Sequence, residues 1–447
     1  MAELTDTAAK PIRAYVLHPD LASGRTQRRT PEHALAEAEA LALALPGIEV
    51  AGTEVARLRT PNPGTLFGKG KVAEIGQRLR DAGIGLVLID GPVTPVQQRN
   101  LEKEWDVKLL DRTGLILEIF ADRARTREGV LQVELAALSY QRTRLVRAWT
   151  HLERQRGGLG FVGGPGETQI EADRRAIDEQ MTRLRRQLER VVKTRTLHRA
   201  ARARVPYPIV ALVGYTNAGK STLFNRLTGA DVVARDMLFA TLDPTMRGIR
   251  LPDAQGGNSG RRIILSDTVG FISDLPPELV AAFRATLEEV LEADLILHVR
   301  DISHPETEEQ AEDVAEILDS LGVDEDVAAI EVWNKIDALG AETRAALRRT
   351  DARTEGVQAV SALTGEGIED LVAAIDAHLG IALDEPRHTA EVLLPFGDGR
   401  RRAWLHEAGV VEREEAETEG LRLHVRWTER QRTGFEALDR PDTTPEN

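Results

Sequence analysis

The stretch that decides the fold reads IVALVGYTNAGKSTLFNRL and occupies residues 209–227. An apolar run, Ile209–Val213, leads into a glycine-rich loop, Gly214–Ser221, which is followed by a helix-like segment. Strand, loop and helix in this order predict a P-loop of the form GxxxxGK[ST]. The backbone N–H groups of the loop and the N-terminus of the helix are then expected to face phosphate oxygens.

Two side chains of this loop have chemistry that suits a phosphate and its metal ion. Lys220 can neutralise the β- and γ-phosphate oxygens, and the hydroxyl of Ser221 can coordinate Mg²⁺. Kinases and ATPases share this loop, so it predicts a nucleoside triphosphate without selecting the base. We expect the nucleotide to contact Gly214, Tyr215, Thr216, Asn217, Ala218, Gly219, Lys220, Ser221 and Thr222.

A second element follows a strand-like run and reads DTVG at residues 267–270. The carboxylate of Asp267 can hold magnesium-bound water, and the N–H of Gly270 can sense a γ-phosphate. We therefore expect contacts with the nucleotide or its magnesium from Asp267, Thr268, Val269 and Gly270.

A third element selects the base. Residues 330–337 read IEVWNKID, an apolar strand that ends in Asn-Lys-x-Asp. The carboxylate of Asp337 can accept hydrogen bonds from N1–H and the 2-amino group of guanine, whereas adenine has no donor there. This predicts GTP in preference to ATP. The residues expected to bind guanine are Asn334, Lys335 and Asp337, joined by Ser361, Ala362 and Leu363, whose backbone N–H groups would reach guanine O6.

The segment FATLDPT, at residues 239–245, lies between the loop and Asp267. A threonine here can complete the Mg²⁺ shell when GTP is bound and leave it after hydrolysis. Thr241 is the favoured candidate and Thr245 is its competitor. We expect nucleotide contacts from Phe239, Ala240, Thr241, Leu242 and Asp243. Magnesium ligation is expected from Ser221, Thr241 and Asp267, and roles in hydrolysis from Lys220, Thr241 and Gly270.

Charge is divided unevenly along the 447-residue chain. Residues 1–204 carry 34 basic and 26 acidic residues, whereas residues 205–447 carry 24 and 46. Between Arg174 and Arg204 there are 11 basic and 3 acidic residues, a density that suits either a phosphate-bearing partner or a solvated helix face. The absence of cysteine excludes disulfides and cysteine-ligated metal sites, and together with the lack of an apolar signal segment it favours the cytoplasm.

The order of elements predicts a multidomain α/β protein. Residues 1–113 read as an N-terminal α/β domain, and residues 114–204 as a helical hairpin with a glycine-rich tip. Residues 205–382 repeat strand–helix units, which implies a mainly parallel sheet in a G domain, and residues 383–447 read as a small α+β domain with an acidic tail. The second hairpin arm carries the apolar seam of a two-helix coiled coil at Ile177, Met181, Leu184, Leu188 and Val191.

Further motifs lie outside the nucleotide loop. They are TLFGKGK at 65–71, QQRNLE at 97–102, DRT at 111–113, EGVLQVELA at 128–136, HLERQ at 151–155 and GPGETQ at 164–169. With these motifs and the segment 239–245, the chain resembles the HflX family of translation-associated GTPases over most of its length. The resemblance implies a GTPase that binds the large ribosomal subunit and splits ribosomes, with rRNA contacts in residues 114–204.

The resemblance also bears on the hairpin tip and on cations. Many family members read Gly-x-Arg-Gly-Pro-Gly-Glu at the tip, whereas residues 160–167 read GFVGGPGE, one residue longer and without that arginine. The tip contacts of the family are therefore not carried over. In GTPases that resemble this one, an asparagine at the position of Asn217 helps to hold K⁺, so K⁺ is expected in addition to Mg²⁺.

Position 271 predicts how hydrolysis is controlled. Ras-like GTPases place a water-orienting glutamine there, but this chain has Phe271, which cannot hydrogen-bond water. We expect slow hydrolysis by the free protein, and the resemblance implies stimulation by the large ribosomal subunit. The alternative is that Phe271 only packs the switch while another residue positions the water.

Two rival functions stay open. The basic hairpin would equally serve a GTP-dependent RNA-remodelling or RNA-modifying enzyme, and the acidic C-terminal half would suit a regulatory GTPase of a protease or membrane complex. We expect a monomer without a transmembrane segment that binds GTP and GDP and associates peripherally with ribosomes in the cytoplasm. A membrane-associated fraction is a secondary expectation.

Overall fold

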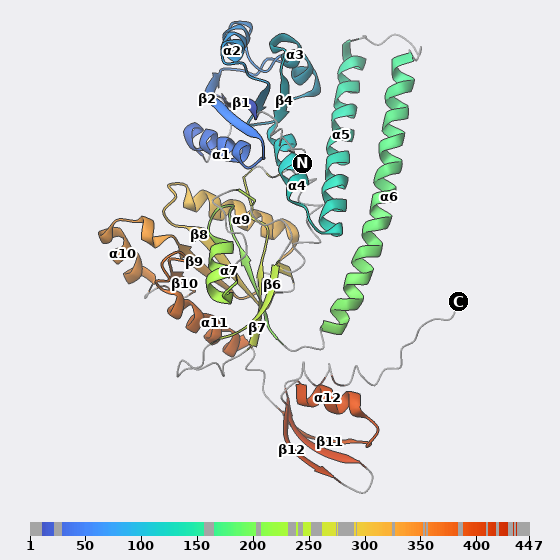
Figure 1. Cartoon of the computed structure of the whole chain (residues 1–447), viewed down its shortest axis with the longest axis vertical. Coiled ribbons are helices and arrows are strands. Elements are labelled where there is room, and N and C mark those ends of the chain that lie inside the picture. The colour runs from blue at the N-terminus through green and yellow to red at the C-terminus, as the bar shows by residue number, and fades with distance from the viewer. Residues whose placement is uncertain are drawn as a thin grey trace, which may run out of the picture.

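The computed structural model gives the arrangement of four groups of elements along the chain (Figure 1). It describes residues 11–21, 29–155, 165–202, 207–230, 238–239, 245–251, 262–273, 275, 290–291, 293–323, 327–351, 354, 356–382, 388–407, 410–416, 420–427, 432 and 435.

The N-terminal unit, residues 11–123, is built on a parallel sheet of strand order β2-β1-β3-β4. Along β3, Leu86 and Leu88 enter one core cluster, whereas Val87 and Ile89 enter another, as the period of two in a strand requires. Helices α1 and α4 contribute to the first cluster, and α2 and α3 to the second, so both sheet faces are covered. The elements are β1 (Ile12–Leu21), α1 (Pro31–Leu43), β2 (Ile48–Leu58), α2 (Lys69–Asp81), β3 (Leu86–Ile89), α3 (Pro95–Trp105), β4 (Lys108–Asp111) and α4 (Arg112–Arg123).

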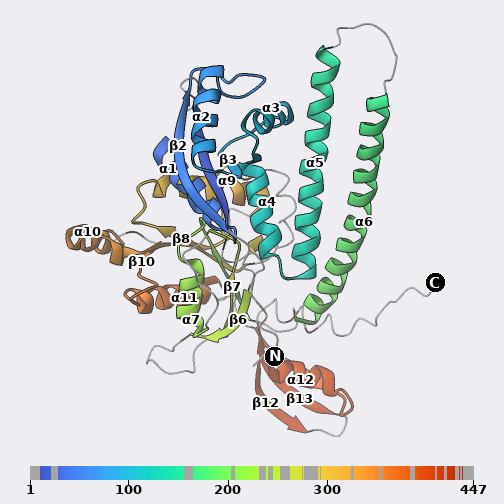
Figure 2. The same ribbon diagram turned by 45° about the horizontal axis from the view of Figure 1, so that its top comes forward.

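Two long helices, α5 (Arg127–Gln155) and α6 (Pro165–Arg202), lie side by side and run in opposite directions (Figures 1 and 2). On α6, Met181 and Leu184 are buried, and Ile177, Leu188 and Val191 are half-buried. These are the five positions predicted to form the seam. The hairpin is held on the N-terminal unit by Tyr140, whose hydroxyl donates to Oδ1 of Asp111 at 2.6 Å.

The central sheet has the strand order β10-β9-β8-β5-β7-β6, and only β6 is antiparallel to its neighbour. Val210 and Leu212 of β5 pack with α7 and α11 on one face, whereas Ala211 and Val213 pack with α9 on the other. The elements are β5 (Ile209–Val213), α7 (Lys220–Thr228), β6 (Thr245–Arg250), β7 (Arg262–Asp267), β8 (Leu295–Asp301), α9 (Thr307–Leu321), β9 (Ala329–Asn334), η1 (Ile336–Ala338), α10 (Ala341–Asp351), β10 (Val357–Ala359) and α11 (Ile368–Ala382).

The C-terminal part is a small antiparallel sheet of order β11-β13-β12 with one helix. Trp404, Trp427 and Phe435 form its core together with aliphatic residues. Its elements are β11 (His388–Leu394), α12 (Gly399–Glu407), β12 (Val411–Ala416) and β13 (Leu421–Trp427). The predicted fold class, multidomain α/β with a mainly parallel sheet followed by a small α+β part, is confirmed.

Candidate nucleotide-binding site

The glycine loop connects β5 to α7 at the carboxyl end of the central sheet, where open α/β sheets bind ligands. Gly214 has a φ of 150°, and a Cβ there would lie 2.2 Å from the carbonyl oxygen of Val299. Gly219 has a φ of 94°, and its Cβ would lie 2.2 Å from Nδ2 of Asn334. Only glycine fits both positions, because any side chain would meet strained dihedrals and a steric clash together.

Lys220 lies inside the curve of this loop. Its Nζ donates to the carbonyl oxygens of Gly214 and Tyr215 at 3.0 and 2.8 Å. Burial lowers the pKa of Lys220 to about 8, and the charge of Asp267 acts in the opposite direction. The loop therefore holds an ammonium group where the charge of the β- and γ-phosphates would stabilise it.

The two magnesium candidates on either side of the loop are brought together. Oγ of Ser221, in the first turn of α7, donates to Oδ2 of Asp267 at 2.7 Å. Asp267 ends β7 and is fully buried. A hydroxyl and a carboxylate at adjacent positions are hard oxygen donors that fit Mg²⁺. Ser221 and Asp267 would hold Mg²⁺ there, and the ion would supply positive charge that stabilises the phosphates during hydrolysis.

Of the two threonines that could complete this magnesium shell, the structure describes only one. Thr241, with Ala240, Leu242 and Asp243, lies outside the described residues. Thr245 opens β6 and is paired with Asp267 across the antiparallel strands. The choice between Thr241 and Thr245 therefore stays a prediction.

The residues predicted to bind guanine lie close to the glycine loop. Asn334 donates from Nδ2 to the carbonyl oxygen of Ala218 at 2.8 Å and accepts from the N–H of Ala362 at 2.9 Å. Lys335, at a φ of 65°, pairs with Asp301 at 2.8 Å. Asn334 thus joins the phosphate loop to the loop after β10, and Asp337 follows it in η1.

Arg226 is a residue of this site that the sequence interpretation missed. From α7 it donates to the carbonyl oxygens of Ala362, at 3.1 Å, and Leu363. These bonds fix the backbone whose N–H groups were predicted to reach guanine O6, and Leu363 is itself exposed. The only sequence signal was its place on the helix that starts at Lys220, which does not single it out.

The Asp-x-x-Gly segment lies directly against the phosphate loop. Thr268 donates to the carbonyl oxygen of Leu212 at 2.6 Å, and Val269 is buried. A Cβ on Gly270 would lie 2.8 Å from Cγ2 of Thr216 and 3.0 Å from Nζ of Lys220. Gly270 thus packs against Thr216 and lies near the ammonium group that would meet the γ-phosphate.

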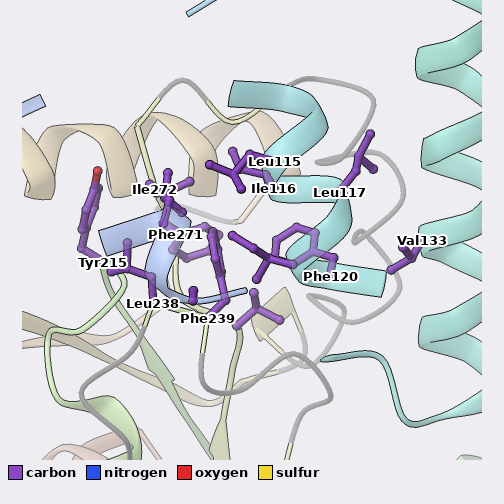
Figure 3. Packing of buried hydrophobic residues seen from close by; sticks show 14 of the residues in the cluster. Leu115, Ile116, Leu117, Phe120, Val133, Tyr215, Leu238, Phe239, Phe271 and Ile272 are labelled. Carbon is purple, nitrogen blue, oxygen red and sulfur yellow. The ribbon is translucent and has the colours of Figure 1, made fainter. Parts of the chain in front are cut away.

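Phe271 continues this contact. Its N–H donates to the carbonyl oxygen of Gly214 at 3.1 Å, and its carbonyl accepts from the N–H of Thr216 at 2.7 Å. The ring is buried, in one cluster with Phe239 and with Leu115, Ile116 and Phe120 of α4 (Figure 3). Phe271 therefore packs the switch against the N-terminal unit and cannot orient the attacking water.

Comparison with protein families covers almost the whole chain. Residues 32–121 match the model described as GTP-binding GTPase N-terminal, and residues 123–202 the GTP-binding GTPase middle region. Residues 209–335 match a model described as 50S ribosome-binding GTPase, and residues 346–441 the HflX C-terminal domain.

The chain also has long, close relatives. It is 54% identical over 372 residues to GTPase HflX of Magnetococcus marinus, covering 83% of each chain. The chain belongs to the HflX family. GTPase HflX of Escherichia coli is 44% identical over 381 residues, which are 85% of this chain and 86% of the relative. A crystal structure of a GTP-binding protein from Sulfolobus solfataricus with GDP is 24% identical and covers 83% of this chain and 99% of its own, at a TM-score of 0.44.

The family membership predicted from the motifs is confirmed, and the protein is a P-loop GTPase. Its site would hold GTP by the loop 214–221 and by Asp337, and the N–H of Gly270 and the ammonium of Lys220 are predicted to face the γ-phosphate. The assignment of each contact to a residue stays a prediction. Among the described residues, no helix has both the length and the apolar character needed to cross a bilayer.

Proposed function

We propose that this GTPase binds the large ribosomal subunit through the hairpin of α5 and α6, and that its GTP form splits or rescues stalled ribosomes. Support comes from the match of residues 209–335 to a family model described as a 50S ribosome-binding GTPase. Hydrolysis would be stimulated by the ribosome, with Mg²⁺ and K⁺ as cofactors. The protein would act as a monomer, peripheral to ribosomes in the cytoplasm.

The observation that carries the proposal is the set of exposed arginines on α6. The apolar positions of this helix face α5, and most of its charged positions are exposed, although Asp178 pairs with Arg142 of α5 and Arg175 pairs with Glu171 of the same helix. Arginines are phosphate ligands of fixed geometry, and several exposed arginines on one helix suit an RNA backbone. The arginines exposed on the described part of α6 are Arg174, Arg175, Arg183, Arg185, Arg186 and Arg190.

Co-sedimentation with large subunits tests the proposal. The protein loaded with a non-hydrolysable GTP analogue should pellet with the subunit, and a variant with Arg183, Arg185 and Arg186 changed to glutamine should pellet less. If each arginine meets one phosphate, the change should reduce the slope of log affinity against log salt by roughly 2 to 3. The matched control removes three exposed arginines from the acidic half, at Arg349, Arg400 and Arg413.

The same experiment separates the rival functions. An RNA-remodelling enzyme would bind protein-free rRNA as tightly as the assembled subunit, and a regulatory GTPase of a protease or membrane complex would not pellet with either. Equal pelleting of both triple variants and the unchanged protein would contradict the assignment to the hairpin.

A further inference from the structure

We propose that Tyr215 is a positioning residue whose side-chain hydroxyl couples the γ-phosphate side of the GTP site to the docking of the N-terminal unit. The residue is the second of the glycine loop, but its side chain leaves the loop and enters the interface with the N-terminal unit. The inference goes beyond ribosome binding and concerns the GTPase itself.

The hydroxyl of Tyr215 joins three parts of the chain. It donates to Oε2 of Glu37 at 2.5 Å, and it accepts from the N–H of Ser273 at 2.9 Å. Oγ of Ser273 lies 2.7 Å from the same oxygen. Glu37 belongs to α1, Tyr215 to the phosphate loop, and Ser273 follows Gly270 by three residues. One oxygen atom therefore connects the N-terminal unit, the loop and the segment that was predicted to sense the γ-phosphate.

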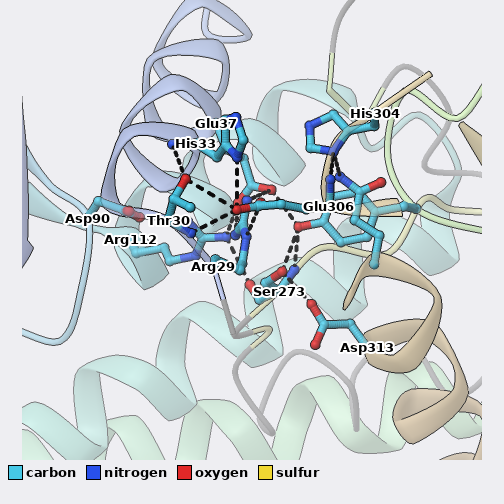
Figure 4. Close-up of polar contacts among 12 residues, drawn as sticks. Arg29, Thr30, His33, Glu37, Asp90, Arg112, Ser273, His304, Glu306 and Asp313 are labelled. Carbon is cyan, nitrogen blue, oxygen red and sulfur yellow. Dashed lines mark hydrogen bonds and ion pairs between the residues drawn. The ribbon is translucent and has the colours of Figure 1, made fainter. Parts of the chain in front are cut away.

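Residues of the N-terminal unit bind Glu37 and Ser273 from the other side of the interface. Arg112, the first residue of α4, donates to Oε1 of Glu37 at 2.5 Å and to the carbonyl oxygen of Ser273 at 2.9 Å. Arg29 binds Glu37 from a second direction at 2.9 Å (Figure 4). Oγ of Ser273 donates to Asp313 of α9 at 2.5 Å. Ser273 is thus fixed by both halves of the interface.

Burial makes the loss of one partner costly. Tyr215 is 4% exposed and Ser273 5%, and the side chains of Glu37 and Arg112 are 8% and 7% exposed. If the tyrosine hydroxyl is removed, Glu37 and the N–H of Ser273 each lose a partner in a region that water does not reach. A buried polar group that has no hydrogen-bond partner costs free energy, because it has given up its hydrogen bonds to water and gained none in the protein.

The hydrogen bonds of Tyr215 and Ser273 determine where Gly270 lies. The backbone of Phe271 is bonded to Gly214 and Thr216, and Ser273 is bonded to Tyr215, so the segment is fixed at Phe271 and again two residues later. This arrangement places Gly270 against Thr216 and Lys220, where its N–H can meet a γ-phosphate. GTP and the docked N-terminal unit therefore favour the same position of Gly270. GDP, which has no γ-phosphate, does not share this preference.

Linkage requires that the coupling act in both directions. If docking helps to place Gly270 for the γ-phosphate, the γ-phosphate must strengthen docking by the same factor. Apolar contacts, such as the edge-to-face pair of Phe120 and Phe239 at 4.6 Å, also hold the units together. The hydroxyl of Tyr215 makes the strength of docking depend on which nucleotide is bound.

The substitution Tyr215→Phe tests this, because it removes only the hydroxyl. The dissociation constants of GDP and of a non-hydrolysable GTP analogue should be measured by calorimetry. We expect the analogue to bind about tenfold more weakly and GDP to be nearly unchanged, as for the loss of one hydrogen bond to a charged group. The control is Tyr140→Phe, which removes a half-buried hydroxyl bound to Asp111 elsewhere in the fold and should leave both constants unchanged.

Hydrogen exchange supplies the second measurement. In the unchanged protein, the analogue should raise the protection of α1 and α4 above the level seen with GDP, and this difference should be lost in Tyr215→Phe. Ser273→Ala removes the hydroxyl shared with Tyr215 and Asp313 and serves as the second variant should Tyr215→Phe fail to fold. An equal loss of affinity for both nucleotides, or an unaltered gain in protection in the folded variant, would overturn the proposal.

Discussion

Ser361 donates a hydrogen bond from its Oγ to Oδ1 of Asp337 across 2.5 Å. The serine is fully buried, and its Oγ also accepts from the N–H of Thr364 at 3.0 Å. Ser361 therefore fixes one carboxylate oxygen of Asp337, so that the second is oriented before a base arrives. Such preorganisation is what a base-specific acceptor requires.

Asp337→Asn should change the base that the protein prefers. An amide can donate to the 2-oxo group of xanthine, which the carboxylate cannot do, so GTP binding should weaken and XTP binding should strengthen. A ratio of GTP to XTP affinity that falls by about a hundredfold would match the exchange of two hydrogen bonds. The control is Asp319→Asn, an exposed acid on α9. An unchanged ratio would refute the base-reading role.

Hydrolysis should run faster in K⁺ than in Na⁺ at equal ionic strength. Asn217 has a φ of 60° in the glycine loop, beside the position predicted for the phosphates. A K⁺ held there would supply positive charge in place of an arginine finger. Steady-state turnover in the two salts, for the unchanged protein and for Asn217→Ala, measures the effect. Equal rates in both salts would leave Asn217 with a structural role in the loop.

Buried carboxylates of the interface predict an acid-sensitive contribution to stability. Burial raises the pKa of Glu37, but the charges of Arg112 and Arg29 outweigh it and hold the pKa below the ordinary value of 4.5. The ionised form therefore stabilises the fold above pH 4.5, and the contribution is lost as the pH falls through the lowered pKa.

Glu37→Gln should accordingly lower the apparent free energy of unfolding by about 3 kcal/mol at pH 7, because it leaves the buried Arg112 and the half-buried Arg29 each short of a partner. The difference from the unchanged protein should shrink as the pH is lowered below 4.5. Urea titrations over a pH series measure it, with the exposed Glu32→Gln on the same helix as control. A difference that stays constant or grows with acid would contradict the assignment.

The sequence predicted those parts of the site that depend on short spacing. The loop 214–221, Asp267 with Gly270, and Asn334 with Asp337 each combine local backbone geometry with a fixed distance along the chain, so their meeting at one sheet edge followed from the parallel strand order. The predicted fold class followed from the same alternation of strands and helices.

Contacts between units could not be predicted in this way. Tyr215 and Glu37 are 178 residues apart, and their hydrogen bond depends on how two separately formed sheets dock. Neither residue predicts such a contact from its type, because a tyrosine in a glycine loop and a glutamate on a helix both occur in many proteins without one. The sequence could suggest that Phe271 packs the switch but not against what, since the cluster that it joins includes Leu115 and Phe120 of α4.

Phe271→Gln should raise the turnover of the free protein, because it returns a water-orienting side chain to the switch. The gain should be limited, since the buried ring also packs against α4 and glutamine would lose that contact. Phe271→Leu keeps an apolar side chain and should give no gain. Single-turnover rates of both variants, compared with thermal unfolding, separate the effect on chemistry from the effect on packing. A gain of the same size in Phe271→Leu would refute the explanation.

The central claim, a GTPase completed by the large ribosomal subunit, is tested most directly by steady-state turnover with and without purified large subunits. Since Lys220, Gly270 and Mg²⁺ would hold the phosphates while no side chain at position 271 aligns water, the free protein should be slow. Large subunits should accelerate it about a hundredfold, which corresponds to about 3 kcal/mol in the barrier. A free protein that already turns over rapidly, at a rate that large subunits leave unchanged, would contradict the account.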